Sequence, residues 1–476
     1  MRGRPRIFVN MMSKQMDKKK KRKTRRKGGR NKRIWPIMFG SMAVFCVLLC
    51  MFFVSEFLKD SDGKGGIGES SSVREKADVE ESLEKHTSAA EPSSKKADEP
   101  KKTKKQKKVK EQEKKPEKTG KSKKNTVESK IQKKIHSMSL AEKVAQMFII
   151  TPESLTGYSL VTMAGKITKD ALDQYPVGGL IYMGANIKSE SQVTEMIQKQ
   201  QRYSRERIGL PLFISVDEEG GQVTRIASCG EMNVTVFPDI SKIGASKDKG
   251  RAYELGDVIG EYLSRMGFNL NLAPVADVLT NADNTVVKRR SYGSDPKLVS
   301  EMVKENLDGL WKHQVYGCIK HFPGHGATAG DTHQGYAYTN KTWEELDNSD
   351  VIPFRECIKH GVKFIMVGHI SLPNVTKEDV PASLSSEVIN GILREKLGYD
   401  GIVMTDALNM SAVIQQYTVA QAAVQAVLAG NDILLMAVDF KAAYEGILQA
   451  VQDGIITEER LDESVGRILK VKMMYE

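Results

Sequence analysis

Residues 401–406 read Gly-Ile-Val-Met-Thr-Asp, a short apolar run that ends in a carboxylate. Seven similar runs occur along the chain at an average spacing of roughly 40 residues, and amphipathic stretches with apolar positions at helical spacing separate them. The eight runs are 145–150, 178–183, 212–217, 268–277, 317–322, 363–369, 401–406 and 432–437. Continuous apolar strands that alternate with helices form a parallel sheet covered on both faces. Eight such units predict an α/β protein with a closed (β/α)8 TIM barrel. An open, doubly wound sheet is the alternative, but no G-x-G-x-x-G follows the first run.

Polar residues mark one end of these predicted strands. Asp217, Asp277, the Lys320-His321 pair, His369 and Asp406 each end a different run. A single Asp in such a place often only caps the following helix. Polar ends on five strands instead predict a shared cluster at the carboxyl-terminal face of the barrel, where barrel enzymes build their active sites.

The densest polar segment, residues 320–333, reads Lys-His-Phe-Pro-Gly-His-Gly-Ala-Thr-Ala-Gly-Asp-Thr-His. Its three histidines and one aspartate fit no common zinc spacing, so we expect neither a metal nor an organic cofactor. A carboxylate at Asp331 beside the imidazole of His333 would set its tautomer and raise its pKa, which makes a proton donor near neutral pH. Taken alone, such a pair also occurs as an ordinary loop hydrogen bond.

Four motifs in order give the chain a specific resemblance: VDEEGGQVTR, then NLAPVADV with RRSYGSDP, then KHFPGHGxxxxDTH, then VMTDALNM. Together they resemble the family 3 glycoside hydrolases, and among these the bacterial β-N-acetylglucosaminidases of peptidoglycan turnover, over residues 130–476. The resemblance implies a (β/α)8 barrel and retaining hydrolysis of terminal, non-reducing β-linked N-acetylglucosamine. It assigns Asp406 as the nucleophile, His333 as the general acid/base and Asp331 as its partner. The chain has Asp-Thr-His where Asp-Ser-His is common, and we expect it to lack the second, C-terminal sandwich domain of many relatives.

The same resemblance assigns five residues to sugar binding. They are Asp217, Arg225, Arg290, Lys320 and His321. Asp217 precedes Gly220-Gly221, where backbone without side chains could approach a ligand closely. For both Asp217 and Asp406 the alternative is a structural role as a cap of a following helix or loop.

The N-terminal part has a different composition. Residues 1–125 hold 36 Lys+Arg and 16 Asp+Glu, whereas the remaining 351 residues hold 36 and 44, so the overall charge of +12 averages two unlike pieces. This argues against a uniformly basic nucleic-acid-binding protein. Trp35 to Val54 is a 20-residue stretch without charge, long enough for a bilayer core of about 30 Å.

Twelve basic residues precede this stretch between Lys18 and Arg33. The positive-inside rule therefore predicts a single-pass membrane protein with a cytoplasmic tail (1–33), an uncleaved signal anchor (34–58) and an extracytoplasmic remainder. A cleaved signal peptide is the competing interpretation, but no A-x-A site follows. Val47-Leu48-Leu49-Cys50 resembles a lipoprotein box only weakly, because Leu49 stands where a small residue is expected.

Residues 59–125 are rich in Lys, Glu and Ser and poor in apolar residues, which predicts a disordered linker before a catalytic domain over 126–476. The lysine run is either a solvated spacer or a nonspecific contact with anionic wall polymers.

Three functions are compatible with the sequence. The first is a membrane-anchored exo-β-N-acetylglucosaminidase acting on peptidoglycan or muropeptides, with β-glucosidase specificity as a variant. The second is a phosphorylase that transfers the glycosyl unit to phosphate. The third is a non-catalytic wall-binding module, against which the intact Asp331, His333 and Asp406 argue.

Overall fold

The computed structural model describes residues 119–329, 337–377 and 380–475, with side chains from Val127 onward. The predicted tail (1–33), anchor (34–58) and most of the linker (59–125) lie outside these residues, as does the segment with Asp331 and His333. Within the described ranges, no helix has the length and apolar character needed to cross a bilayer.

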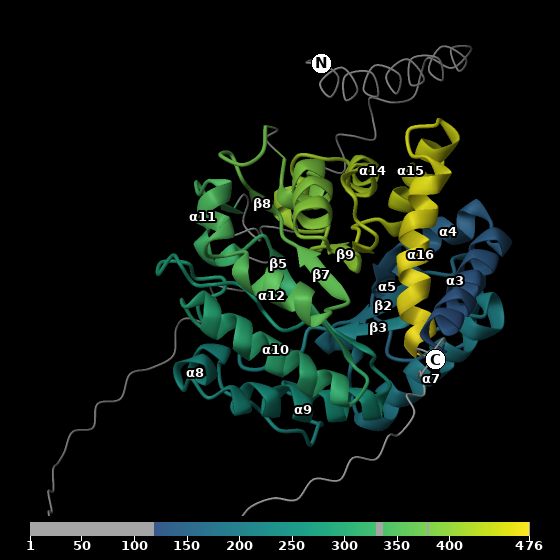
Figure 1. Ribbon diagram of the computed structural model, residues 1–476. Helices are drawn as coiled ribbons and strands as arrows, with labels where there is room; N and C mark the ends of the chain where they lie inside the picture. Colours follow the sequence, from purple (N-terminus) through teal and green to yellow (C-terminus); the bar gives the residue numbers. More distant parts are fainter. Residues whose placement is uncertain (1–118, 330–336, 378–379, 476) are drawn as a thin grey trace, which may run out of the picture. The chain divides into compact units, whose positions relative to one another are not determined.

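Eight parallel strands form the centre of the molecule, surrounded by helices (Figure 1). They are β1 (Phe148–Ile150), β2 (Gly179–Tyr182), β3 (Phe213–Val216), β4 (Leu270–Asn271), β5 (Tyr316–Phe322), β7 (Phe364–Val367), β9 (Ile402–Thr405) and β10 (Leu434–Leu435). The order β10-β1-β2-β3-β4-β5-β7-β9 is closed by a parallel bridge between Met404 and Ile433. Each strand coincides with one predicted run, so the TIM-barrel prediction is confirmed.

The strands are buried along their whole length, because the barrel interior covers one face and the helices the other. Those described on the outside are α3 (Thr119–Ser137), α4 (Leu140–Gln146), α5 (Pro152–Thr156), α6 (Lys166–Gln174), α7 (Glu190–Ile208), α8 (Ile240–Ala245), α9 (Lys249–Met266), α10 (Pro296–Lys312), α11 (Trp343–Asp347), α12 (Ile352–His360), α13 (Ser411–Ile414), α14 (Val419–Ala429), α15 (Phe440–Gln452) and α16 (Glu458–Tyr475). Short turns η1 (Gly184–Asn186), η2 (His325–Ala327) and η3 (Ala382–Leu384) and the π-helix η4 (Glu387–Lys396) complete the set.

Helices α9 and α10 approach each other closely at two glycines. A Cβ on Gly256 would lie 2.1 Å from the Asn306 carbonyl oxygen, and one on Gly309 would lie 2.4 Å from that of Tyr253. No larger side chain fits at this crossing, so α10 is held firmly against α9. This matters for the site because the loop from β4 to α10 carries several of its residues.

Helix α3 begins at Thr119, and its later turns place Ile131 and Ile135 in an apolar cluster with Val465 and Leu469 of α16. One feature differs from the sequence-based expectation. A small second sheet, β6 (Ala337–Tyr338) with β8 (Ile370–Ser371), lies outside the barrel ring and was not predicted.

Candidate active site

Six of the eight predicted site residues lie in the described part of the chain, in or after strands β3, β4, β5 and β9. Asp217 directly follows β3, and Arg225 lies further along the same loop. Lys320 and His321 belong to β5 itself, Arg290 lies in the loop after β4, and Asp406 directly follows β9. Asp331 and His333 fall outside the described residues, so their positions stay predictions.

Lys320 joins two carboxylates from the β3 loop. Its Nζ lies 2.8 Å from Asp217 Oδ1 and 2.7 Å from Glu219 Oε1, and the side chain is buried. Burial alone would lower the pKa of Lys320, but Asp217 and Glu219 raise it above its ordinary value. The lysine is therefore a permanent cation at the carboxyl end of the barrel.

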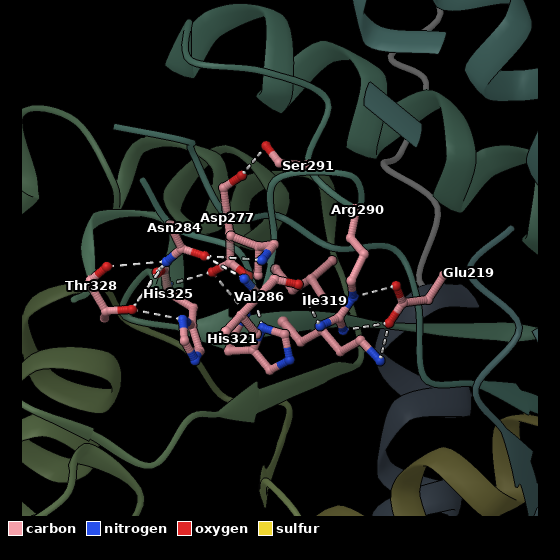
Figure 2. A network of polar contacts seen from close by, with 12 residues as sticks. Glu219, Asp277, Asn284, Val286, Arg290, Ser291, Ile319, His321, His325 and Thr328 are labelled. Carbon is pink, nitrogen blue, oxygen red and sulfur yellow. Dashed lines mark hydrogen bonds and ion pairs between the residues drawn. The ribbon is translucent and has the colours of Figure 1, made fainter. Parts of the chain in front are cut away.

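Glu219 also forms a two-pronged ion pair with Arg290, which Figure 2 shows. Arg290 Nε and Nη2 lie 2.8 and 2.7 Å from its two carboxylate oxygens. Burial alone would raise the pKa of Glu219, but Arg290 and Lys320 hold it well below its ordinary value. Arg290, predicted to bind sugar, is thus occupied by a neighbour that sequence reasoning missed. The sequence did contain a hint of this role. Glu219 belongs to the acidic run after β3, and the predicted cations Lys320 and Arg290 need a counter-charge at the same face of the barrel.

Asp277, at the end of another predicted run, fixes both histidines of the β5 segment. Its Oδ1 accepts from the backbone N–H groups of His321 (3.1 Å) and His325 (2.6 Å), and its Oδ2 lies 2.7 Å from His321 Nδ1 (Figure 2). Because Asp277 holds Nδ1, His321 keeps Nε2 for another partner, and the described residues supply none. Asp277 therefore orients the imidazole and is itself fully occupied.

The other acidic residue after β3, Glu218, shapes the loop that carries Arg225. Its buried carboxylate accepts from the N–H groups of Arg225 (2.6 Å), Ile226 (2.8 Å) and Ala227 (2.9 Å) and from the Tyr262 hydroxyl (2.9 Å). Arg225 Nη2 then reaches to 3.9 Å from Asp217 Oδ2. The structure thus brings Arg225 close to Asp217, and it does so through the carboxylate of Glu218, which was not among the predicted site residues.

The adjacent Gly220 and Gly221 have a different role from the one expected. Their φ angles of +92° and +59° lie in the left-handed region, and a Cβ on Gly221 would lie 2.7 Å from Asp239 Cα. The close approach that requires glycine is therefore to the protein's own backbone. The motif makes the turn that returns the chain after Asp217.

Asp406 lies beyond the last residue of β9, and its side chain is only partly buried. Burial would raise the pKa of Asp406, but His321, the Ala407 N–H group and Lys320 together lower it below its ordinary value. Its Oδ1 accepts from Ala407 N–H at 2.7 Å, and no other described residue bonds the carboxylate. The carboxylate is therefore ionised and keeps an unused oxygen.

No regular helix begins at Asp406, because α13 starts at Ser411 behind Met410. The helix-cap alternative for Asp406 is thus excluded. Asp217 does not cap a helix either, because the next helix, α8, begins only at Ile240. The carboxylate of Asp217 accepts a hydrogen bond from Lys320 instead.

His369 supports the backbone beside Asp406. Its Nε2 lies 3.0 Å from the Ala407 carbonyl oxygen and its Nδ1 lies 2.6 Å from Ser383 Oγ. Burial lowers the pKa of His369 more than Asp406 raises it, so the ring is neutral and donates from Nε2 to the carbonyl. His369 is a structural partner of the β9 loop rather than a free site residue.

Together, these side chains offer one available carboxylate, a neighbouring ring nitrogen and a cation shared between two carboxylates. Such a set suits a neutral, hydroxyl-rich ligand attacked by a carboxylate. Within the described ranges, no three His, Cys, Asp or Glu side chains come close enough together to hold a metal ion.

Comparison with known proteins agrees with this arrangement. β-Hexosaminidase A of Pseudoalteromonas piscicida is 31% identical over 329 residues, which cover 64% of this chain and 54% of that protein. The structure of a glycoside hydrolase family 3 β-N-acetylglucosaminidase from Paenibacillus sp. str. FPU-7 matches with a TM-score of 0.67 and 39% identity, over 71% of this chain and 63% of that one. The β-glucoside phosphorylase BglX matches with a TM-score of 0.65 and 26% identity, over 74% of this chain and 60% of that one.

The chain thus spans about half the length of the Pseudoalteromonas enzyme. Residues 139–471 match the model of the glycosyl hydrolase family 3 N-terminal domain. This match covers well over half of the sequence and includes every strand of the barrel. The chain belongs to glycosyl hydrolase family 3.

Proposed function

We propose that this protein is a retaining exo-β-N-acetylglucosaminidase that removes terminal, non-reducing N-acetylglucosamine from peptidoglycan or muropeptides. The observation that carries the proposal is Asp406, an ionised carboxylate with an unused oxygen beside His321 and Lys320. A retaining glycosidase needs such a carboxylate as nucleophile and a second group as proton donor. The names of the hexosaminidase relatives support the sugar.

In the proposed mechanism Asp406 attacks the anomeric carbon while the bond to the leaving oxygen breaks. His333, oriented by Asp331, gives its proton to that oxygen, which leaves a glycosyl-enzyme. His333 then takes a proton from water, and the water oxygen displaces Asp406. Asp217, Lys320 and His321 bind the sugar hydroxyls, and Arg290 acts through Glu219, whose position it holds.

Phosphorolysis is the second candidate, because a phosphorylase shares the fold. A phosphate acceptor needs a cation that is not already neutralised. Lys320 and Arg290 are both paired with carboxylates, which favours water as acceptor. Arg225, whose contact with Asp217 is long at 3.9 Å, is the cation best placed to serve phosphate.

The decisive experiment measures full-length protein on a chromogenic N-acetylglucosaminide and on the disaccharide of N-acetylglucosamine and N-acetylmuramic acid, with and without phosphate. We expect free N-acetylglucosamine from both, in the anomeric form of the substrate bond when first released. Sugar phosphate as the main product would identify a phosphorylase. No turnover of either substrate would support the non-catalytic module.

The role of His333 can be tested separately from that of Asp406, because only the acid/base step depends on the leaving group. His333→Ala should slow the disaccharide by about 10²–10⁴-fold but spare the first step for an aryl glycoside with an acidic leaving group. Azide, a small nucleophile that needs no base, should then release the accumulated glycosyl-enzyme. Asp331→Asn should give a milder form of the same pattern. Equal slowing on both substrates, without azide rescue, would remove His333 from the mechanism.

We also propose that residues 34–58 anchor the enzyme in the cell membrane, with the catalytic domain outside and the tail (1–33) in the cytoplasm. The uncharged 20-residue stretch behind twelve basic residues supports this orientation. Protease added to intact cells should release an active fragment by cutting between residues 59 and 118. Resistance of intact cells combined with cleavage in inside-out vesicles would reverse the orientation.

A further inference from the structure

Three residues of the loop between β4 and α10, Thr280, Asn281 and Asn284, contact both sides of the segment that contains Asp331 and His333. We name these three residues the stem clip. We propose that the stem clip, and Asn284 above all, is a positioning device for the general acid/base of the proposed glycosidase. The inference rests on the proposed function, but it adds residues that do not touch the sugar.

Asn284 is buried and uses both ends of its carboxamide. Its Oδ1 accepts from the N–H groups of Val286 and Val287, each at 3.0 Å, which fixes its Nδ2 toward the β5 segment. Nδ2 donates to the carbonyl of His325 at 2.8 Å and lies 3.2 Å from both the carbonyl oxygen and Oγ1 of Thr328 (Figure 2). The side chain therefore connects two chain segments with a defined orientation.

Thr328, three positions before Asp331 in the sequence, is contacted by both asparagines of the stem clip. Asn281 Nδ2 also donates to its carbonyl, at 2.9 Å, and its hydroxyl lies 2.8 Å from His325 Nδ1. The next residue, Ala329, pairs through its backbone with Tyr338, with N–O distances of 3.0 and 3.1 Å. Ala329 and Tyr338, which flank the acid/base segment in the sequence, are thus joined directly.

The far side is held by the same loop. Lys341 Nζ lies 3.0 Å from Thr280 Oγ1 and 2.5 Å from Oδ2 of the fully buried Asp350. Ala337 and Tyr338 form β6, which pairs with β8 just after His369. The described residues that flank positions 330–336 on either side are therefore tied to the barrel.

The β4–α10 loop also holds the sugar-binding side. Ser291 Oγ donates to the Asp277 carbonyl at 2.7 Å, and the neighbouring Arg290 pairs with Glu219. One loop therefore sets the stems of the acid/base segment and the residues around His321 in a common frame. Misplacement of a catalytic group by about 1 Å costs on the order of 10²-fold in rate, so such a frame has a measurable kinetic effect.

Asn284→Asp is the sharpest test, because it keeps the shape and the contacts with Val286 and Val287. It replaces the donor that faces two carbonyl oxygens with a repelling oxygen. A matched control is Asn269→Asp on the opposite face of the barrel. Asn269 is equally buried, accepts from Ile214 N–H at 2.8 Å and donates to the Leu212 carbonyl at 2.9 Å.

The measured quantity is the ratio of kcat/KM for the disaccharide to kcat/KM for an aryl N-acetylglucosaminide with an acidic leaving group, using the full-length protein. Asn284→Asp should lower this ratio about 10- to 100-fold, because only the disaccharide needs the positioned acid. Asn269→Asp should lower the melting temperature and leave the ratio unchanged. If Asn284→Asp does not fold, Asn281→Ala, which removes one donor to Thr328, should lower the ratio in the same direction by a smaller factor.

Two results would overturn the inference. One is an unchanged ratio in a folded stem-clip variant, and the other is an equal change in Asn269→Asp. Failure of the proposed function is a different outcome, because the wild-type protein would then turn over neither substrate.

Discussion

Two buried charge clusters lie at opposite ends of the barrel, and they use similar residues differently. The upper cluster, Asp217, Glu219, Arg290 and Lys320, lies at the carboxyl ends of the strands. The lower cluster surrounds Asp432, which lies two residues before the start of β10. Asp432 Oδ2 binds Arg394 (2.6 Å) and the Val403 N–H group (2.9 Å), and Oδ1 binds Ser464 (2.7 Å) and Arg467 (3.0 Å).

The lower cluster is complete within the chain. Both oxygens of Asp432 have at least two partners, and a third guanidinium group, that of Arg460, lies 3.9 Å from Oδ1. Arg394 also donates to the carbonyls of Tyr399 and Gly401. In the upper cluster Glu219 is equally occupied, but Asp217 has only the 3.9 Å contact on its second oxygen, and nearby Asp406 keeps one oxygen unused among the described residues. Incomplete pairing, rather than buried charge, therefore distinguishes the proposed binding site from the structural ion cluster in this barrel.

The largest effect is expected for Asp406→Asn, which removes the charge of the available carboxylate without changing its shape. Turnover of every glycoside should fall by on the order of 10⁴-fold or more, because the nucleophile is needed whatever the leaving group. The melting temperature should change little, since Ala407 N–H still has an oxygen to bind. Activity within tenfold of wild type, measured on homogeneous protein, would exclude Asp406 as nucleophile.

Asp432→Ala tests the other side of the comparison. Loss of this carboxylate leaves three mostly buried guanidinium groups without their counter-charge, which should lower the free energy of unfolding by about 3–5 kcal/mol. Urea denaturation measures this loss. The kcat/KM of the folded protein should stay within about threefold of wild type, and a large activity loss at unchanged stability would contradict a purely structural role.

Lys320→Met and Lys472→Met compare two buried lysines at the two ends of the barrel. Loss of Lys320 removes a cation from the proposed sugar-binding site and should lower kcat/KM by about 10²-fold, while Glu219 keeps Arg290 as partner. Lys472, which donates to Gln146 Oε1 at 2.8 Å, should affect stability alone. Equal activity losses in the two variants would show that the upper lysine acts only through folding.

The smallest effect concerns pH. The pKa of Glu219 is lower in the folded state than its ordinary 4.5. The ionised carboxylate therefore stabilises the folded state fully above about pH 4.5, and this stabilisation is lost as the pH falls below that value. The difference in unfolding free energy between wild type and Glu219→Gln should therefore shrink below pH 4.5, at up to about 1.4 kcal/mol per pH unit. A difference that stays constant from pH 7 to pH 3 would contradict the shifted pKa.

The barrel was predictable because its evidence is local and repeated. Each strand is buried on both faces, so runs such as 212–217 and 401–406 are apolar throughout and end where the chain reaches the active face. The small sheet of β6 and β8 escaped prediction because two-residue strands carry no periodicity. The burial of Ile131 and Ile135 of α3 could not be read from the local sequence, because it depends on α16, which lies more than 300 residues away along the chain.

The chain's residue pattern alone was sufficient for the fold class and for the positions of Asp217, Lys320, His321 and Asp406, because strand ends of a parallel barrel must meet at one face. Which charges remain available there depended on tertiary structure. Glu219 neutralises Arg290, Asp277 occupies His321 Nδ1, and His369 binds a backbone carbonyl, and each of these pairings joins residues from different strands or loops. A sequence lists the donors and acceptors, but only their distances decide which of them are already satisfied.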